Sequence, residues 1–326
     1  MYIKRLLMIV VFLGLIGGGI FAYMVYDTFF LPNTRFNNEE AFVYISSDAD
    51  FPQVKEMLDP LLKDVDAFEA VAKRKQYINN IRPGKYRITK GMNNNEIVNA
   101  LRIGNIPVKV SFNNQESLPL LAGRIASQIE ADSLSLLEAM NDKAYLEEKG
   151  IDPETALGMY LPNSYELYWN TGAEEFRDRM YKEYDRFWND ERKKKARDIG
   201  LSPMQVIALA SIVHKETAKV EERPRVAGVY LNRIRQKMLL QADPTVIYAI
   251  KKETGNYDTV IKRVLYRDLA LDSPYNTYKY PGVPPGPIAM PDISAIDAVL
   301  NAEKHRYLYF VVDMEAFGYH KFAESL

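Results

Sequence analysis

Apolar residues fill one long uninterrupted stretch near the start of the chain. Residues 6–26 contain no charged side chain, and as a helix these 21 positions would measure about 30 Å, one hydrocarbon core of a bilayer. Lys4 and Arg5 precede the stretch, so the positive-inside rule predicts a cytoplasmic segment 1–5 and a translocated remainder. We expect an uncleaved single-pass anchor. A cleaved signal peptide is the alternative, although no clean small-x-small cleavage site follows.

Beyond a polar linker at 27–40, the pattern alternates between short strands and short helices. The apolar periods and turn residues predict a small α+β module over residues 41–115. Its expected elements are a strand at 41–45, helices at 51–62 and 65–75, a strand at 84–89, a helix capped by Asn94 and closed by Gly104, and a strand at 108–112. On composition alone, a simple spacer is the alternative.

Helical periods dominate residues 116–326, which we expect to form one mainly helical domain with a short C-terminal β-hairpin. The expected helices are 117–131, 133–142, 173–190 with a basic cluster at 192–197 near its end, one capped by Ser202, 224–238, one from Asp243 to Gly255, and one with a capping box of Ser294 and Asp297. A buried strand at 307–313 would pair with 318–322 in the hairpin. The fold class is therefore α+β.

Composition narrows the range of functions. The chain has 326 residues, with 42 Lys and Arg against 43 Asp and Glu, and this balance argues against nucleic acid as a partner. It has no cysteine, which excludes disulfides, thiolate metal sites and cysteine nucleophiles. With three scattered histidines, neither a metal site nor a cofactor is expected.

Glu216 is the first candidate for chemistry. It lies seven residues after Leu209 and four after Ile212, which places its carboxyl on the apolar face of the helix that begins after Ser202. A last-turn glutamate that reaches solvent or caps a neighbouring helix is the structural alternative. Asp243 is a rival carboxylate, although an aspartate directly before a proline is a typical N-cap. A mechanism with paired carboxylates would require the fold to bring the two together.

A proline-rich segment at 273–292 is the second candidate feature. Its six prolines in twenty residues exclude a regular helix or a central strand and predict a rigid, ordered loop. The loop carries Tyr275, Asn276, Tyr278 and Tyr280, side chains suited to stacking on and hydrogen bonding to sugar rings. We expect at least one of these tyrosines to pack the loop onto the domain instead.

Several of these motifs together resemble a known family. "ALASIVHKETA", "RVAGVYLNRI", "QADPTVIYAI" and "SPYNTYKYPGVPPGPIAMP", in this order behind one N-terminal anchor, resemble the YceG-like family of endolytic murein transglycosylases. "RPGKYRITKGMNNNEIVNALRIGN" is similar to that family's LysM-like, peptidoglycan-binding module. The resemblance implies that Glu216 is the catalytic glutamate. It also implies that four further residues lie around the substrate cleft: Gln241, Asp243, Asn276 and Tyr278. The chain departs from the family pattern at Leu157, Asn163 and Met290.

The resemblance implies a lyase of the bacterial cytoplasmic (inner) membrane. It would cleave the MurNAc–GlcNAc β-1,4 bond of nascent glycan strands without water, leaving 1,6-anhydro-MurNAc ends and limiting strand length. The implied partners are peptidoglycan, the bilayer through residues 6–26, and peptidoglycan synthases of the penicillin-binding class. Two alternatives stay open: a hydrolytic muramidase that uses Glu216 and Asp243, and a non-catalytic peptidoglycan-binding scaffold.

Overall fold

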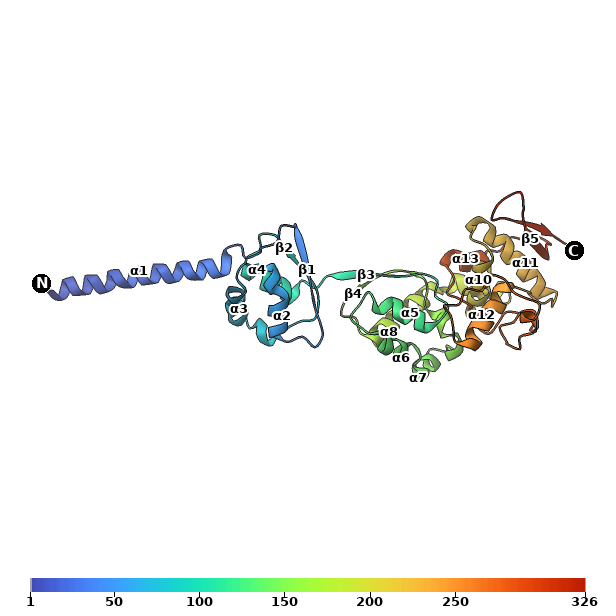
Figure 1. The fold of residues 1–326 in the computed structure, drawn as a ribbon, viewed down its shortest axis with the longest axis horizontal. Helices are drawn as coiled ribbons and strands as arrows, with labels where there is room; N and C mark the ends of the chain where they lie inside the picture. The colour runs from blue at the N-terminus through green and yellow to red at the C-terminus, as the bar shows by residue number, and fades with distance from the viewer. Residues whose placement is uncertain (1, 326) are drawn as a thin grey trace. The chain divides into compact units, whose positions relative to one another are not determined.

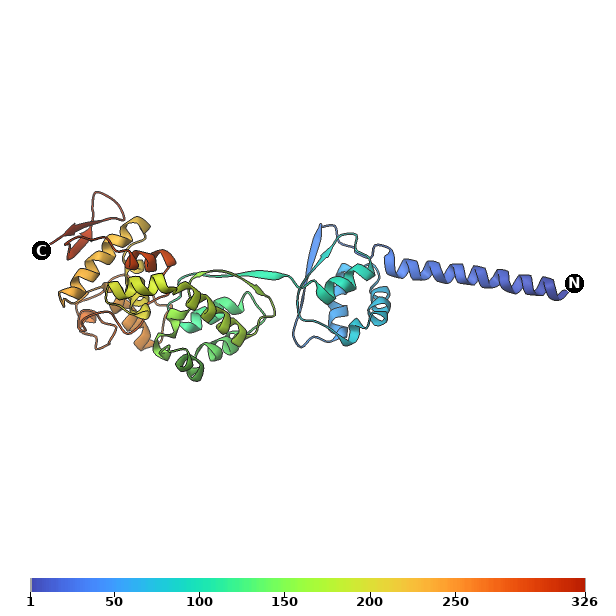
Figure 2. The same cartoon turned by 180° about the vertical axis from the view of Figure 1, so that it is seen from behind.

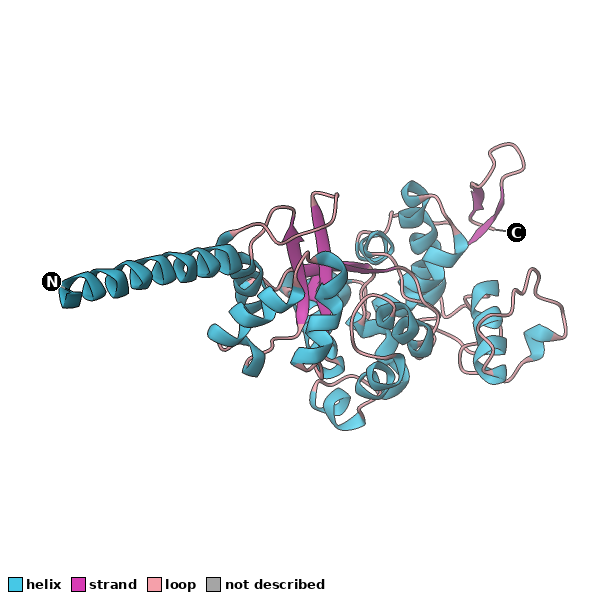
Figure 3. Cartoon of the chain, turned by 60° about the vertical axis from the view of Figure 1, so that its left-hand side comes forward, coloured by secondary structure: helices cyan, strands magenta, loops and turns pink. Residues whose placement is uncertain are grey.

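The computed structural model describes residues 2–325, and the chain divides into two compact units. The first unit ends at Lys109 and also takes in Glu166–Thr171; the second comprises Val110–Tyr165 and the chain from Gly172 onward. Helices predominate, and the named strands form three two-stranded sheets (Figure 1, Figure 3). This mixture of many helices with few strands, behind an apolar N-terminal helix, confirms the coarse fold class predicted from the sequence.

The first unit begins with the apolar helix α1, Tyr2–Phe30, which has the length and composition of a membrane span; a signal sequence would share both. A second group of elements forms the globular part: β1 (Glu40–Ile45), α2 (Phe51–Leu58), η1 (Asp59–Leu61), α3 (Val65–Arg74), η2 (Tyr77–Asn79), β2 (Gly84–Thr89) and α4 (Asn94–Ile103). β1 and β2 pair antiparallel, with Glu40 opposite Thr89 and Ile45 opposite Gly84. Their inward side chains pack on buried residues of α2, α3 and α4.

The expected linker at 27–40 is largely part of this first unit. α1 continues to Phe30, and the side chains of Asn33 and Thr34 are buried. The Asn33 Nδ2 group donates to Asn94 Oδ1 over 2.6 Å, and Asn94 Nδ2 donates to the Thr28 carbonyl over 2.8 Å. Asn93, not Asn94, caps α4, and the Asn94 side chain instead bonds to Thr28 near the end of α1 and to Asn33 beyond it. Buried carboxamides satisfy one another here, which a polar pattern alone did not reveal.

The second unit is mainly helical. The chain enters it along β3 (Pro107–Phe112), leaves it along β4 (Asn163–Tyr168) and returns at Gly172, and the strands β3 and β4 pair. Its helices are α5 (Leu118–Ala126), α6 (Ser133–Met140), α7 (Lys143–Glu148), η3 (Pro153–Met159), α8 (Ala173–Phe187), α9 (Asp190–Asp198), α10 (Pro203–Glu216), η4 (Val220–Glu222), α11 (Arg223–Arg235), α12 (Asp243–Thr254), η5 (Asp268–Ala270) and α13 (Ile293–Leu300). The basic cluster expected near the end of α8 forms the separate helix α9, capped by Asn189.

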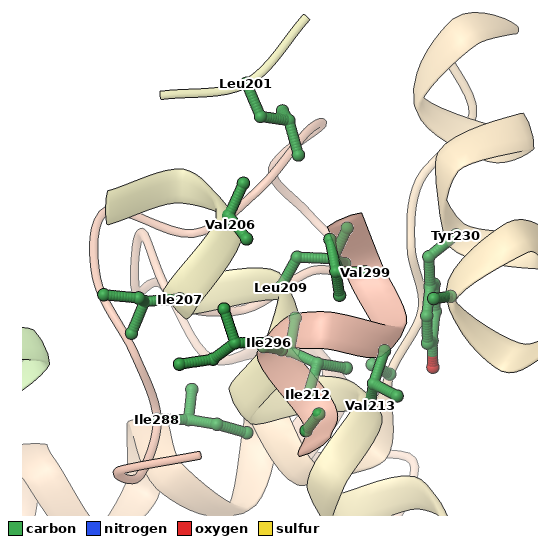
Figure 4. Close-up of a cluster of buried hydrophobic side chains, with 14 of the residues drawn as sticks. Leu201, Val206, Ile207, Leu209, Ile212, Val213, Tyr230, Ile288, Ile296 and Val299 are labelled. Carbon is green, nitrogen blue, oxygen red and sulfur yellow. The ribbon is translucent and has the colours of Figure 1, made fainter. Parts of the chain in front are cut away.

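α10 is the central helix of this unit. Ser202 and Gln205 form a reciprocal capping box at its start, and every residue from Val206 to Val213 is buried. Figure 4 shows Leu209, Ile212 and Val213 packed toward side chains of α13 and toward Tyr230 of α11. A helix enclosed on all sides fixes the position of its last residue, which is Glu216.

The chain ends in a hairpin of β5 (Tyr309–Val312) and β6 (His320–Ala323), which lies beside α11 (Figure 2). The prediction of a buried strand here was wrong, because Val311 and Val312 are 65% and 62% exposed. The capping box expected at Ser294 and Asp297 was also wrong. Ser294 Oγ accepts a hydrogen bond from Arg223, and Asp297 pairs with Arg192, so both side chains are used in contacts between helices.

Candidate active site

Glu216 ends α10 and directs its carboxyl into a pocket. The next residue, Thr217, is extended and stops the helix, so the carboxyl stands at the end of a buried helix rather than along its side. The side chain is partly exposed. The hydroxyl of Tyr230, a wholly buried side chain of α11, donates a hydrogen bond of 2.8 Å to Glu216 Oε1. Packing and this hydrogen bond together hold the carboxyl in one orientation.

The pocket has a volume of about 370 Å³ and draws on four segments that are distant in sequence. Its lining residues are Glu216, Tyr230, Arg233, Leu240, Gln241, Asp243, Tyr278, Phe310, Val311, Val312 and His320. The structure thus brings four of the five site residues predicted from the sequence into one pocket. The fifth, Asn276, is not among the residues that line this pocket.

The environment of Glu216 favours its protonated form. Burial, reinforced by the nearby Asp243 carboxylate, raises the pKa of this carboxyl to about 7. The hydrogen bond from Tyr230 and the electrostatic influence of His320 and Arg233 act in the opposite direction and limit this shift. A carboxyl with a pKa near neutrality can both donate and accept a proton at the pH at which it works.

Asp243 does not have the capping role that its sequence context suggested. Ala242, which has no polar side chain, occupies the N-cap position of α12. The Asp243 carboxylate is exposed and accepts a hydrogen bond of 2.5 Å from the hydroxyl of Tyr278. Burial and this partner raise the pKa of Tyr278 well above its usual value. The Tyr278 hydroxyl therefore stays neutral and donates to Asp243 on the pocket wall.

Gln241 holds an unusual backbone conformation at the pocket rim. Its φ angle is 50°, in the left-handed region that residues other than glycine and asparagine adopt at a cost. The conformation is held by the proline-rich loop: Gln241 N donates to the Thr277 carbonyl over 3.1 Å, and Ala242 N donates to Thr277 Oγ1 over 3.0 Å. Strained residues of this kind often lie at functional sites. The exposed Gln241 side chain faces the pocket.

Asn276 supports the site from within the loop. Its side chain is 0% exposed, and Nδ2 donates to the carbonyls of Leu269 and Leu271 while Oδ1 accepts from the backbone of Tyr278. In this conformation Asn276 shapes the turn that presents Tyr278. Of the other loop tyrosines, Tyr275 is buried, as expected for at least one of them, and Tyr280 donates to Asp272.

Sequence reasoning missed several residues of the pocket. Tyr230 lies within the motif "RVAGVYLNRI", but nothing in the local pattern assigned it to the site. Arg233 is buried and donates to the carbonyls of Leu308 and Leu240 over 2.7 Å each, so it fastens the hairpin segment to the pocket rim. Phe310 and His320 come from that hairpin. Nothing in their local pattern indicated that they would meet Glu216.

The three departures from the family pattern lie away from this pocket. Leu157 and Met290 are buried, and the Met290 backbone bonds to Gln115. Asn163 lines a separate polar pocket with Arg124. Within residues 2–325, no three His, Asp or Glu side chains gather closely enough to hold a metal ion.

The site thus consists of a buried helix that ends in a protonatable glutamate, within a pocket that the C-terminal hairpin helps to close. The YceG-like family profile matches residues 43–326, and the chain belongs to this family. An endolytic murein transglycosylase of Bacillus subtilis (strain 168) is 30% identical over 271 residues, which cover 77% of this chain and 72% of that protein. An endolytic murein transglycosylase of Streptococcus pneumoniae (strain D39) is 27% identical over 93% of this chain, which spans only 60% of that longer protein.

A solved structure is also similar to this chain, and it too is of a YceG-like protein. The crystal structure of a YceG-like protein from Listeria monocytogenes aligns with a TM-score of 0.58 at 27% identity, covering 89% of this chain and 97% of that one.

Proposed function

We propose that this protein is an endolytic murein transglycosylase, a lyase that cleaves the MurNAc–GlcNAc β-1,4 bond of glycan strands and leaves 1,6-anhydro-MurNAc ends. The observation that carries the proposal is the raised pKa of the Glu216 carboxyl. Its pKa of about 7, set by burial at the end of α10, suits a residue that must give up a proton and then recover one. The similarity to named murein transglycosylases supplies the substrate class.

The chemistry requires one acid and base from the protein. Protonated Glu216 donates its proton to the glycosidic oxygen as the bond from C1 breaks. The resulting carboxylate then takes the proton of the C6 hydroxyl of the same sugar, and the C6 oxygen bonds to C1. The acetamido group of that sugar can stabilise the anomeric centre meanwhile, as in substrate-assisted glycosidases. No water is consumed, and Glu216 ends protonated as it began.

The neighbours of Glu216 support each stage. Tyr230 donates to Oε1 and so orients the carboxyl and stabilises its ionised form between the two proton transfers. Asp243 and Tyr278 form a hydrogen-bonded pair on the pocket wall, available to bind sugar hydroxyls. Gln241 adds an exposed carboxamide. We assign Asn276 a positioning role, because its polar atoms are committed to the loop.

A hydrolytic muramidase is the nearest alternative. It would need Asp243 to activate a water or to attack the sugar, whereas one oxygen of this carboxylate already accepts the Tyr278 hydroxyl. The products separate the two reactions, because a hydrolytic end is heavier than an anhydro end by one water. A non-catalytic scaffold would bind strands and release no fragment.

The remaining organisation follows from the same proposal. Residues 41–115 act as a LysM-like module that binds peptidoglycan, and residues 116–326 as the catalytic domain. α1 anchors the chain in the cytoplasmic membrane with residues 1–5 in the cytoplasm, a direction supported by Lys4 and Arg5. The enzyme would then act outside the cytoplasm on nascent strands, beside peptidoglycan synthases, and limit strand length.

Glu216→Gln tests the catalytic assignment. The variant keeps the shape of the side chain and loses the transferable proton, so turnover of purified glycan strands should fall at least ~10²-fold. Mass spectrometry of the fragments measures both the rate and the type of end. Asp243→Asn is the parallel variant: an equal collapse there, with reducing ends in the wild-type products, would favour the muramidase. Anhydro ends released at the normal rate by Glu216→Gln would refute the mechanism.

A further inference from the structure

A second pocket is lined from two of the same helices as the pocket of Glu216. It has a volume of about 270 Å³, and its lining residues are Glu116, Lys215, Pro244, Ile247, Tyr248, Lys251, Val260, Ile261 and Ile288. Lys215 directly precedes Glu216, and Pro244 directly follows Asp243. Both pockets are therefore lined by residues of the last turn of α10 and the first turn of α12. We call this cavity the second pocket.

The second pocket holds an excess of positive charge. Glu116 accepts from Lys215 over 2.7 Å and from Lys251 over 2.6 Å, so one carboxylate is shared by two ammonium groups. Burial disfavours the Glu116 carboxylate, but the hydrogen bonds and charges of the two lysines outweigh it and hold its pKa below the usual range. Lys251 is well enclosed, with a side chain 12% exposed. A net charge of one cation therefore remains in a confined space.

The rest of the lining is apolar. Tyr248 and Ile288 are almost fully buried, while Val260, at 79% exposed, stands at the rim. Ile288 is held in place because its backbone N–H donates to Ser211 Oγ of α10 over 3.0 Å. Such a cavity suits a ligand that combines small apolar groups with a carboxylate, because ammonium groups form charge-assisted hydrogen bonds with carboxylates.

We infer that the second pocket binds the acidic peptide that murein strands carry on alternate sugars, and that it selects strands that bear this peptide over bare glycan. The inference rests on the proposed function, which puts such a strand across Glu216. A sugar in the catalytic pocket would carry its peptide within reach of the second pocket. The methyl groups of the alanine residues would meet Ile247, Tyr248 and Ile288, and a peptide carboxylate would meet Lys251 and Lys215.

The experiment compares two substrates with one enzyme preparation in detergent. One is purified glycan strands with intact peptides, and the other is the same strands after an amidase has removed the peptides. We expect a higher kcat/KM on peptide-bearing strands. Lys251→Met, which keeps the apolar stem and removes the charge, should reduce that preference about tenfold, the scale of a hydrogen bond to a charged group. Lys251→Arg should retain most of it.

Lys252→Met is the matched control. Lys252 is the next residue of α12, but it pairs with Glu154 outside the second pocket, so its loss should leave the preference intact. Melting temperatures show whether each variant folds. Equal losses by Lys251→Met on both substrates would indicate a structural ion-pair network and overturn the inference, as would a wild-type enzyme that does not distinguish the two strands.

A binding measurement separates this inference from the proposed function. Calorimetric titration of the Glu216→Gln protein with a soluble disaccharide tripeptide should show binding that Lys251→Met weakens. If wild-type protein cleaves neither strand while this titration shows lysine-dependent binding, the proposed reaction fails and the peptide site stands. If it shows none, the peptide site fails, whatever the reaction.

Discussion

Glu216 is held between opposing electrostatic influences. Burial and Asp243 favour its neutral form, while Tyr230, His320 and Arg233 favour its charged form. These side chains can be replaced one at a time, so single substitutions can shift the balance in either direction. The carboxyl is therefore a site where the proposed reaction and the stability of the fold respond to pH through the same group.

Tyr230→Phe should move the pH profile of cleavage. Removing the hydroxyl takes away a hydrogen bond that favours the charged carboxylate, so the pKa of Glu216 should rise above about 7. The alkaline limb of kcat/KM should then shift upward by about one pH unit, with a lower maximum rate. Tyr280→Phe, which loses a hydroxyl bonded to Asp272 outside the pocket, is the control. A lower rate with an unmoved limb would show that Tyr230 only supports packing.

Glu216→Gln should also change how stability depends on pH. The raised pKa means that the folded chain holds a proton on Glu216 which the unfolded chain releases above its ordinary value of 4.5. Between that value and about 7, unfolding of the wild type therefore becomes easier as pH rises, by at most about 1.4 kcal/mol per pH unit. Glutamine does not titrate, so the variant lacks this contribution to the pH dependence of the unfolding free energy. The melting temperature of the variant should equal that of the wild type near pH 4 and exceed it at pH 7; a gap that is largest in acid would contradict this.

The C-terminal hairpin forms one wall of the pocket of Glu216. Phe310 and His320 line the pocket from this hairpin, and Glu222 of η4 bonds to His320. Glu222 is 4% exposed at its side chain and accepts from both the backbone N–H and the Nδ1 group of His320, over 2.7 Å each. One buried carboxylate thus ties the hairpin to the start of α11.

Glu222→Ala should loosen this hairpin. It leaves two donors of His320 without their partner, which should cost about 1–3 kcal/mol of unfolding free energy and raise KM as the pocket wall becomes less defined. Thermal unfolding and steady-state kinetics measure the two effects. Glu221→Ala is the control, because the neighbouring Glu221 is exposed and accepts a solvent-exposed hydrogen bond from the Tyr319 hydroxyl. If both variants lose the same unfolding free energy, the hydrogen bonds from His320 to Glu222 do not stabilise the hairpin.

Most individual elements were predictable where local chemistry decides them. The cap at Ser202 was predicted correctly because this N-cap side chain binds the first turn of its own helix. The same rule failed at Asp243 and Ser294, where Tyr278 and Arg223 from distant segments take the polar group. The pairing of β3 with β4 and the small helix α7 were not foreseen, since neither has a strong local period.

For the whole molecule, the apolar N-terminal helix and the mixed content of helices and strands followed from residue patterns. The assembly of the pocket did not. Glu216, Asp243 and Tyr278 are joined by contacts between segments, and a sequence gives no distances between segments. Their grouping could be stated beforehand only through the family resemblance, which did not extend to Arg233 or His320.

Membrane topology gives a prediction at this scale. Lys4 and Arg5 lie before an uncharged span, so the folded units should lie outside the cytoplasm. Alkaline phosphatase fused after residue 40 should be active, and a cytoplasmic fluorescent reporter at the same junction should be dark. The reverse pair of results would place the folded units inside the cell and rule out contact with the wall.

Contacts at the end of α1 determine how the first unit can move relative to this helix. Asn94 binds the Thr28 carbonyl and accepts from Asn33, and Phe29 packs against the core of the first unit. With α1 in the bilayer as proposed, this unit is attached rigidly to the membrane helix and not through a flexible linker. It must rotate with the helix and stay at the lipid surface. The glycan that this unit is proposed to bind must therefore lie in a thin layer of wall next to the membrane, where new strands emerge.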